Sequence, residues 1–361
     1  MLTLNKVEVR TVIVPLNRPV ISKVGTFAEW PLVLTDLYTD QGIVGHSYLE
    51  PYLTKAARYL KPMIEDLVEA QRGHAVAPRA MFRAAMGSLH LIGRQGLAII
   101  AGAGLDMAAW DVLAKEAGLP LAVLLGGELK PVPAYNSNGL WLLPYEKLAA
   151  ETEALVAEGA FDALKLRLGR ERLQEDLDAI RTVKDVVGPE AHLMCDFNQG
   201  LSLAEALHRC HALDDQGLYW FEEPIVYDNL RGLAQLAREL KTPVQIGENF
   251  YGPRALQEAL VAKATDLVMP DLMRIGGVSG WMDAAAIAAA AGIPVSTHLY
   301  PEVSAHLMCV TDTAHWLEWQ DWANPVLREP FRVENGHLII PDVPGNGIEW
   351  DQTAVGRYAA A

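Results

Sequence analysis

ALKLRLG, at residues 163–169, alternates leucines with the two cations Lys165 and Arg167. In a β-strand successive side chains point to opposite faces, so Lys165 and Arg167 point the same way. One face of this strand is apolar, and the other presents two neighbouring positive charges that need anionic partners. The stretch therefore predicts a strand whose charged face belongs to a polar site.

Residues 131–319 repeat this strand-like pattern eight times, with helical segments between the repeats. The runs are PVPAYNS (131–137), ALKLRLG (163–169), HLMCDFN (192–198), LYWFEEP (218–224), PVQIGEN (243–249), DLVMPDL (266–272), IPVSTHL (293–299) and AHWLEW (314–319). Intervening stretches such as 202–216 and 280–292 are rich in alanine and leucine, which suits covering helices. Eight strands alternating with helices predict a closed parallel α/β barrel.

The residues before and after this barrel show a different pattern of hydrophobic and polar residues. Residues 1–50 alternate as strands do, with a turn at residues 40–42, and residues 54–126 have helical spacing. We therefore predict an α+β domain at 1–126, the barrel at 127–320 and a C-terminal segment at 321–361. That segment contains VENGHLIIPDVPGNGIEW, whose residues are typical of strands and turns. We therefore predict that the C-terminal segment rejoins the first domain.

Composition excludes several classes of protein. The 361 residues are 51% hydrophobic and 21% charged, which is enough to bury a large core. With 30 basic against 45 acidic residues the formal charge is -15, which disfavours nucleic acid and anionic membranes as partners. The three cysteines show no CxxC spacing, and the N-terminus lacks a signal-peptide pattern. We expect a cytoplasmic protein that binds neither nucleic acid nor membrane.

Polar side chains stand near the ends of successive runs, 20 to 31 residues apart, which is about the length of one βα unit. They are Lys165 and Arg167, Asp196 and Asn198, Glu222, Glu248, Asp271, His298 and Glu318. The C-terminal ends of parallel barrel strands meet at one face, where barrel enzymes build their sites. We therefore expect these side chains to converge at a single mouth.

Three of these residues, Asp196, Glu222 and Glu248, would crowd like charges on neighbouring strands. An isolated carboxylate at a strand end is more often a helix cap or an ion-pair partner, but three together need a cation. An all-oxygen ligand set without a cysteine pair favours Mg²⁺ over Zn²⁺. The sequence therefore predicts a magnesium site at this mouth.

The order of these motifs resembles the enolase superfamily and, within it, the mandelate racemase group (the mandelate racemase/muconate lactonizing enzyme family). The motifs are KLR (165–167), DFN (196–198), EEP (222–224), GEN (247–249), PD (270–271), STH (296–298) and WLE (316–318). The resemblance runs nearly end to end and includes GLDMAAWDVLAKEAGLPL and the late PGNGIEW.

The resemblance implies an α/β fold: a modified (β/α)₇β TIM barrel with an N-terminal α+β capping domain that the C-terminal segment completes. It implies that Asp196, Glu222 and Glu248 bind one Mg²⁺ per subunit, and that Ser137 contacts a substrate carboxylate. It also implies a small-molecule carboxylate substrate and a homo-oligomer, an octamer or smaller.

These residue types suit removal of a proton next to a carboxylate, which is possible only if the enediolate is neutralised as it forms. Mg²⁺ on one carboxylate oxygen, with Lys165 and a protonated Glu318 near the other, would do this. His298 would act as a base oriented by Asp271, and Asn198 would touch metal-bound groups or substrate.

Arg167 departs from the group's pattern, in which a second lysine commonly faces His298 across the substrate. A guanidinium holds its proton with a pKa above about 12 and is a poor base at neutral pH. A single base suits dehydration of a sugar acid or related 2-hydroxy acid to a 2-keto acid. The alternatives are racemisation or epimerisation, if Lys165 or Arg167 takes the second role, and a metal-dependent binding protein without catalysis.

The first domain would supply the substrate pocket through two loops, at 22–31 and 46–53, according to the same resemblance. Aromatic residues there suit an apolar substituent, whereas the glutamates suit hydroxyl or cationic groups unless they face solvent. We expect Glu50 and Tyr52 to contact the substrate. Near them would lie Phe27, Glu29 and Trp30.

Overall fold

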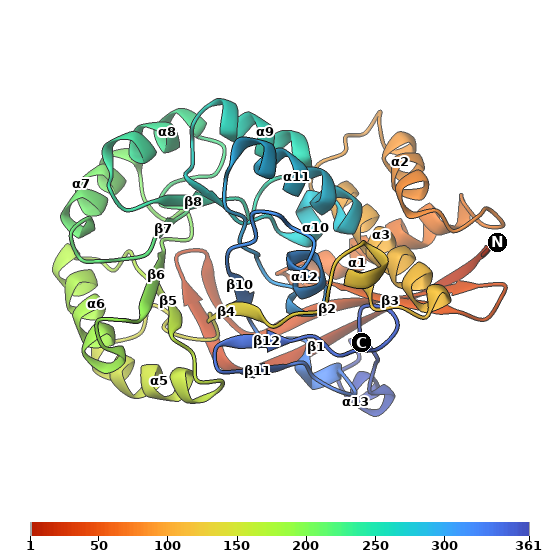
Figure 1. Cartoon of the computed structure of the whole chain (residues 1–361), viewed down its shortest axis with the longest axis horizontal. Coiled ribbons are helices and arrows are strands. Elements are labelled where there is room, and N and C mark those ends of the chain that lie inside the picture. Colours follow the sequence, from red (N-terminus) through yellow and green to blue (C-terminus); the bar gives the residue numbers. More distant parts are fainter. Residues whose placement is uncertain (1, 361) are drawn as a thin grey trace.

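The capping domain begins with a three-stranded antiparallel sheet in the order β1-β2-β3 (Figure 1). The computed structural model describes residues 2–360. The strands are β1 (Leu4–Ser22), β2 (Gly25–Thr39) and β3 (Val44–Leu49), and the helices are α1 (Thr54–Glu69), α2 (Pro78–Ser88), α3 (Leu97–Ala117) and α4 (Leu121–Leu124). The predicted turn at residues 40–42 is confirmed, since it joins β2 to β3.

Helix α3 is the core helix of the cap. It is long and apolar enough to span a membrane, but 83% of that apolar window is buried inside the fold, and no other helix of residues 2–360 meets the same test. Gly45 lets β3 approach α3 closely, because a Cβ there would collide with the Ala108 carbonyl oxygen. The apolar surface of α3 is therefore used for packing between cap elements.

The barrel strands run parallel, and β10 closes the sheet by pairing with β4. They are β4 (Val132–Asn136), β5 (Ala163–Arg167), β6 (His192–Asp196), β7 (Phe221–Glu222), β8 (Val244–Ile246), β9 (Leu267–Val268) and β10 (Leu317–Trp319). All eight predicted runs take barrel positions, but the seventh, around Val295 and His298, makes only isolated bridges. Seven βα units and a final strand confirm the modified (β/α)₇β architecture.

Helices cover the outside of the barrel, as the ring at the left of Figure 1 shows. They are α5 (Tyr145–Ala157), α6 (Leu173–Val187), α7 (Leu203–Leu213), α8 (Leu230–Glu239), α9 (Pro253–Val261) and α11 (Gly277–Ala291). The short helices α10 (Leu272–Ile275) and α12 (Pro301–Met308) are buried and contact the cap. The predicted alternation of strand and helix is therefore present along the whole barrel.

The C-terminal segment contacts both parts of the molecule. It contains η1 (Asn324–Val326), β11 (Arg332–Glu334), β12 (His337–Ile339) and α13 (Gln352–Arg357). Strand β12 extends the barrel sheet by pairing antiparallel with β4, whereas Ala359 bridges Val12 of the cap. The Trp350 indole also donates to the cap carboxylate of Asp36 at 2.6 Å. Completion of the cap by this segment agrees with these contacts, and the boundaries at 126 and 320 stay a prediction.

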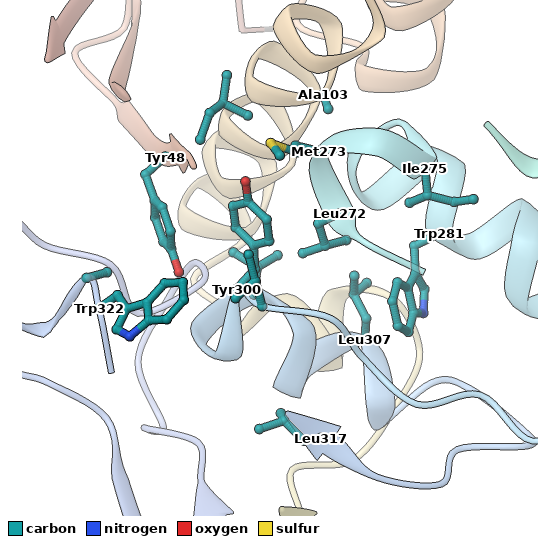
Figure 2. Close-up of a cluster of buried hydrophobic side chains, with 14 of the residues drawn as sticks. Tyr48, Ala103, Leu272, Met273, Ile275, Trp281, Tyr300, Leu307, Leu317 and Trp322 are labelled. Carbon is teal, nitrogen blue, oxygen red and sulfur yellow. The ribbon is translucent and has the colours of Figure 1, made fainter. Parts of the chain in front are cut away.

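An apolar cluster joins cap to barrel (Figure 2). Ala103 of α3 and Tyr48 of β3 meet Leu272 and Met273 of α10 and Tyr300 at the start of α12, as Figure 2 shows. The Tyr48 and Tyr300 rings stack with centroids 5.1 Å apart. This packing fixes the cap against the barrel elements that carry the site.

The tip of the β1–β2 hairpin lies on the loops that follow β5 and β6. A side chain at Gly200 would collide with Lys23 at that tip, and one at Gly169 would lie 3.2 Å from the Lys23 Cε atom. The hairpin therefore covers the mouth formed by the C-terminal ends of the barrel strands.

Candidate active site

The two cations of ALKLRLG both point into the mouth of the barrel, as strand periodicity predicts. The Lys165 ammonium lies 2.6 Å from Glu222 Oε1, 2.7 Å from Glu318 Oε1 and 3.7 Å from Asp196 Oδ2. Burial disfavours the ammonium, but the attraction of these carboxylates is larger and raises the pKa of Lys165. Lys165 is therefore held as a cation.

Arg167 is held by the loop that follows β4. Its Nη1 donates to the carbonyl oxygens of Ser137 and Gly139, each at 3.1 Å, and its Nη2 donates to Ser137 Oγ at 2.8 Å. Its guanidinium also lies 3.8 Å above the centre of the Trp141 ring. These contacts suit a fixed cation, which supports the expectation that Arg167 is a poor base.

His298 and Asp271 form the predicted pair. His298 Nδ1 lies 2.7 Å from Asp271 Oδ2, and His298 Nε2 lies 3.3 Å from Glu248 Oε2. Burial alone would lower the pKa of His298, but the Glu248 carboxylate and the Asp271 hydrogen bond raise it well above its usual value. These two carboxylates therefore favour the protonated imidazole, and a cation bound by Glu248 would lower its pKa again.

Carboxylates crowd the side of the mouth formed by β6, β7 and β8. Burial, with the charges of Asp196 and Glu318, raises the pKa of Glu222 to about 8 despite Lys165. Burial, followed by Glu248 and Asp196, raises the pKa of Glu223 well above its usual value. Glu223 Oε1 is buried and has no hydrogen-bond partner among residues 2–360. A hard divalent cation would relieve both the repulsion and the unpaired oxygen.

The predicted ligands Asp196, Glu222 and Glu248 converge on this region without a ready-made ligand cage. Within residues 2–360 no three His, Cys, Asp or Glu side chains stand in metal-ligating geometry. Lys165 contacts the first two carboxylates, and His298 contacts Glu248. The donor chemistry fits Mg²⁺, and the ligand assignment stays a prediction.

Glu318 differs from the sequence expectation of a protonated acid. Burial would raise its pKa, but Lys165, then His298 and Arg167, lower it to about 2. Ser137 Oγ donates to its Oε1 at 2.7 Å, and the Leu299 N–H donates to its Oε2 at 2.9 Å. In the structure Glu318 is therefore a carboxylate, because the neighbouring ammonium stabilises its charge.

A cavity of about 70 Å³ lies between the hairpin tip and these strand ends. Of the predicted residues, those that border it are Phe27, Trp30, Tyr52, Lys165, Arg167, Asp196, Asn198, Glu248, His298 and Glu318. Ser137, Glu222 and Asp271 lie behind this wall and contact its members through hydrogen bonds. A larger hollow of about 670 Å³ lies beside the C-terminal hairpin, away from the convergent side chains.

The two cap residues predicted to contact the substrate, Glu50 and Tyr52, differ in whether they border the cavity. Tyr52 borders the cavity, but Glu50 lies behind Trp30, whose indole donates to Glu50 Oε2 at 2.6 Å. Burial raises the pKa of Glu50 to about 8. Glu50 therefore supports a wall residue rather than bordering the cavity, and Glu29 is exposed.

An aromatic wall faces the charged side chains. The ring centroids of Trp30 lie 4.3 Å from Trp322 and 5.2 Å from Tyr52, and the Trp322 and Trp141 rings stack at 6.4 Å. Arg274 lies 4.8 Å above the Tyr52 ring. One side of the cavity is thus apolar, and the other carries the predicted chemistry.

Glu223, Arg274, Gln320 and Trp322 are among the residues of this site that were not singled out from the sequence. Glu223 adjoins Glu222 in the same motif, and Gln320 follows Glu318 by two residues, so strand periodicity alone could have found Gln320. Arg274 follows Asp271 within one helical turn. Trp322 carries no sequence signal, because a loop brings it to the cavity.

The backbone around the mouth is strained. Within residues 2–360, seven of the ten non-glycine residues with positive φ belong to the segments around it: Tyr52, Leu140, Asn198, Gln199, Glu223, Leu299 and Tyr300. Such conformations cost about 1–3 kcal/mol each and persist where the surrounding structure imposes them, often at functional sites. Strain concentrated here agrees with a functional role for the mouth.

Two family models match the chain. The mandelate racemase/muconate lactonizing enzyme N-terminal domain matches residues 5–126, and the enolase C-terminal domain-like model matches residues 147–354. L-talarate/galactarate dehydratase of Salmonella typhimurium is 33% identical over 263 residues, which cover 73% of this chain and just under two thirds (66%) of that relative. Other matching relatives are dehydratases, cycloisomerases and an epimerase.

Solved structures match over the full length of the chain. An enolase from alpha proteobacterium bal199, crystallised with bound magnesium, is 53% identical with a TM-score of 0.98, and the match covers 100% of both chains. An enolase from Bradyrhizobium complexed with magnesium and mandelic acid is 41% identical with a TM-score of 0.95, covering 100% of this chain and 99% of that one. The chain therefore belongs to the mandelate racemase/muconate lactonizing enzyme group of the enolase superfamily.

Proposed function

We propose that this protein removes the proton next to the carboxylate of a 2-hydroxy acid that also carries a hydroxyl on C3, with His298 as the base, and completes a dehydration to a 2-keto acid. The observation that carries the proposal is the 2.7 Å contact between His298 Nδ1 and Asp271 Oδ2, which holds an imidazole that borders the cavity. Such a pairing orients an imidazole and raises its basicity.

The metal in this proposal is one Mg²⁺ per subunit, held by Asp196, Glu222 and Glu248. The crowding of buried carboxylates, which raises the pKa of Glu222 to about 8, supports it, as do the magnesium-bound structures of similar enolases. Bound there, Mg²⁺ would supply positive charge that stabilises the enediolate as it forms.

The protein's own residues would carry the proton and hydrogen-bond steps. His298 takes the α-proton, and the electron pair of the broken C–H bond passes into the carboxylate to give the enediolate. Lys165 donates hydrogen bonds to the developing negative charge. The electrons then form a C=C bond as the β-carbon–oxygen bond breaks, and the protonated His298 gives its proton to the leaving hydroxide. Water leaves, and the enol tautomerises to the 2-keto acid.

Arg167 favours this one-base sequence over racemisation. Racemisation needs proton transfer on both faces of the α-carbon, and the Arg167 guanidinium is already engaged by Ser137, Gly139 and Trp141. A protonated guanidinium with several acceptors stabilises charge and does not accept a proton near neutral pH.

Racemisation or epimerisation of a 2-hydroxy acid is the second candidate. The aromatic wall of Trp30, Tyr52, Trp141 and Trp322 suits an apolar substituent, and the similar Bradyrhizobium enolase was crystallised with mandelic acid. In that case Lys165 or Arg167 would transfer the proton on the face of the substrate opposite His298. A binding protein without catalysis is the remote alternative.

The test is to incubate Mg²⁺-loaded enzyme in D₂O with a panel of sugar acids and 2-hydroxy acids. Proton NMR follows loss of the α-proton signal, and product analysis follows 2-keto acid formation. Exchange with keto acid release supports dehydration, exchange with inversion supports racemisation, and no exchange from any acid contradicts both.

The same proposal covers the substrate class, the cellular compartment and the oligomeric state. The substrate is a small-molecule carboxylate, and the enzyme acts in the cytoplasm as a homo-oligomer, an octamer or smaller. The net charge of -15 supports the absence of nucleic acid and anionic membrane partners.

A further inference from the structure

Arg274 of α10 holds the segment between β8 and α9 that carries Glu248. Its Nη1 donates to the backbone carbonyl oxygen of Glu248 at 2.9 Å and lies 3.6 Å from Glu248 Oε1. Its own carbonyl oxygen accepts the N–H of Gly252 at 3.0 Å. Arg274 is only 8% exposed, so water competes little for its guanidinium. The side chain and the backbone of one residue thus fix both ends of residues 248–252.

The same guanidinium lies against the cap. It stands 4.8 Å above the centre of the Tyr52 ring, and Tyr52 borders the cavity. A guanidinium is attracted to the face of an aromatic ring, and the attraction is stronger where water is excluded. The Tyr52 hydroxyl is buried without a partner among residues 2–360. The ring of Tyr52, and not its hydroxyl, therefore makes the contact with Arg274.

Tyr52 depends on such contacts because its backbone is strained. Its φ is +61°, in the left-handed region that is unfavourable for residues with a side chain. A strained residue keeps its conformation only where the surrounding structure imposes it. The ring contacts Trp30 of the cap, with centroids 5.2 Å apart, and Arg274 of the barrel. Loss of the Arg274 contact should therefore let Tyr52 move away from the barrel.

We infer that Arg274 is a positioning residue that couples the cap to Glu248, so that Mg²⁺ binding at the mouth and the contact of Tyr52 with the barrel favour each other. The guanidinium can stack on Tyr52 and bond to Glu248 together only while both are in place. A cation that fixes Glu248 therefore favours the position of Arg274 on which Tyr52 packs, and by linkage the packed Tyr52 strengthens binding of that cation. This inference goes beyond the proposed reaction, but it rests on that proposal for the assignment of Glu248 as a metal ligand.

The positive charge of Arg274 has a separate and opposite effect on the metal. A guanidinium 3.6 Å from a ligand oxygen repels a second cation bound there. The Mg²⁺ affinity of an Arg274 variant alone therefore combines the two effects. A double-mutant cycle separates them, because the repulsion is the same with and without the Tyr52 ring and cancels from the comparison.

The test is calorimetric titration with MgCl₂ of the full-length wild type, Tyr52→Leu, Arg274→Met and the double variant. We expect Tyr52→Leu to weaken Mg²⁺ binding by about 5-fold or more in the wild-type background, and by less than about 2-fold beside Arg274→Met. Arg274→Gln, with a shorter uncharged side chain, serves if the methionine variant folds poorly. Equal effects of Tyr52→Leu in the two backgrounds, or no effect in either, would overturn the coupling.

Two further variants test whether the coupling is specific. Tyr52→Phe keeps the ring, so its Mg²⁺ affinity should stay within about 2-fold of wild type. A loss as large as that of Tyr52→Leu would assign the effect to the hydroxyl and overturn the role of stacking.

Phe27→Leu is the matched control. Phe27 also borders the cavity and contacts Trp30, with centroids 6.1 Å apart, but among residues 2–360 it has no cation–π contact with Arg274. Its effect on the Kd for Mg²⁺ should be the same in the wild-type and Arg274→Met backgrounds. A background dependence as large as that of Tyr52→Leu would show a general loosening of the cap and contradict the specific role of Arg274.

Exchange of the α-proton in D₂O separates this inference from the proposed function. A coupled cycle without exchange from any acid would contradict the proposed function and leave the coupling standing. Exchange by the wild-type enzyme together with an additive cycle would overturn the coupling and leave the proposed function standing.

Discussion

His298 Nδ1 lies 2.7 Å from one oxygen of Asp271, while the other oxygen of that carboxylate accepts the N–H groups of Met273 and Arg274 at 2.9 and 3.1 Å. Asp271 therefore caps α10 and orients the imidazole at the same time. The orientation of the base depends on how α10 is packed, and α10 packs directly on the cap (Figure 2).

His298→Asn should abolish turnover and α-proton exchange. Removal of an acid–base group costs about 10²–10⁴-fold, and here the same imidazole would act in both proton steps. Asp271→Asn should reduce the rate less, because the imidazole remains but loses its carboxylate partner. The measurements are exchange in D₂O and keto acid formation, with circular dichroism as the control for folding. Exchange at the wild-type rate in His298→Asn would disprove the assignment of the base.

Arg167→Lys should add a titratable amine on the face opposite His298. We expect the wild-type enzyme to exchange the α-proton of one configuration only, and the variant to gain exchange with the opposite one. Arg167→Met, which has an unbranched, uncharged side chain that cannot titrate, is the matched control and should gain nothing. NMR of both configurations in D₂O gives the answer. Comparable exchange of both by wild-type enzyme would show that this side already holds an active base.

The barrel could be predicted from the sequence because each strand repeats a short buried pattern at the spacing of one βα unit. Period-two alternation in ALKLRLG placed Lys165 and Arg167 on one face, and the structure agrees. The isolated bridges of the seventh run were not predictable, since hydrogen bonding there depends on how neighbouring strands are aligned. Local patterns therefore gave the strands but not the details of their pairing.

The site was less predictable where it depends on contacts between distant segments. The sequence places Glu50 near the cavity, but packing of the cap puts Trp30 in front of it. The charge of Glu318 depends on a 2.7 Å contact with Lys165 that outweighs burial. Both outcomes follow from tertiary distances of a few ångströms, which residue type and spacing do not contain.

Glu222→Gln should weaken Mg²⁺ binding strongly and remove activity while the fold is retained. The substitution removes one anionic oxygen ligand from the carboxylate cluster, and the apolar layers of the barrel do not depend on it. Calorimetric titration with MgCl₂ measures the binding, and activity after treatment with EDTA provides an independent check. Full activity of the chelated enzyme would exclude the metal-dependent mechanism.

Glu223→Gln provides a comparison for that experiment. Glu223 has a buried oxygen without a partner among residues 2–360, and it adjoins the predicted ligand. If the metal is held by Glu222, the Glu223 variant should lose less Mg²⁺ affinity than the Glu222 variant. A larger loss of Mg²⁺ affinity in Glu223→Gln than in Glu222→Gln would assign the ligand to Glu223 instead of Glu222.

His306 should make the stability of the folded protein depend on pH. It is fully buried in α12, where its Nδ1 accepts the N–H of Ala122 at 3.2 Å, and burial lowers its pKa to about 4. The unfolded chain has a histidine pKa of about 6.5, so between pH 6.5 and 4 the unfolded state binds more protons than the folded state. The contribution of His306 is therefore fully present above pH 6.5 and is lost as the pH falls towards 4.

The loss between pH 7 and pH 5 should be about 2 kcal/mol of unfolding free energy from this residue alone. His306→Asn keeps an acceptor for the Ala122 N–H but does not titrate, so its stability should fall less over the same range. Urea unfolding of both proteins at pH 7 and pH 5 gives the change in unfolding free energy between the two pH values for each protein. Any loss of stability caused by the smaller asparagine side chain is the same at both pH values, so it cancels from this comparison. His315, whose pKa burial also lowers to about 4, contributes equally to both proteins and cancels as well. Parallel pH profiles for wild type and variant would show that His306 is not the titrating group.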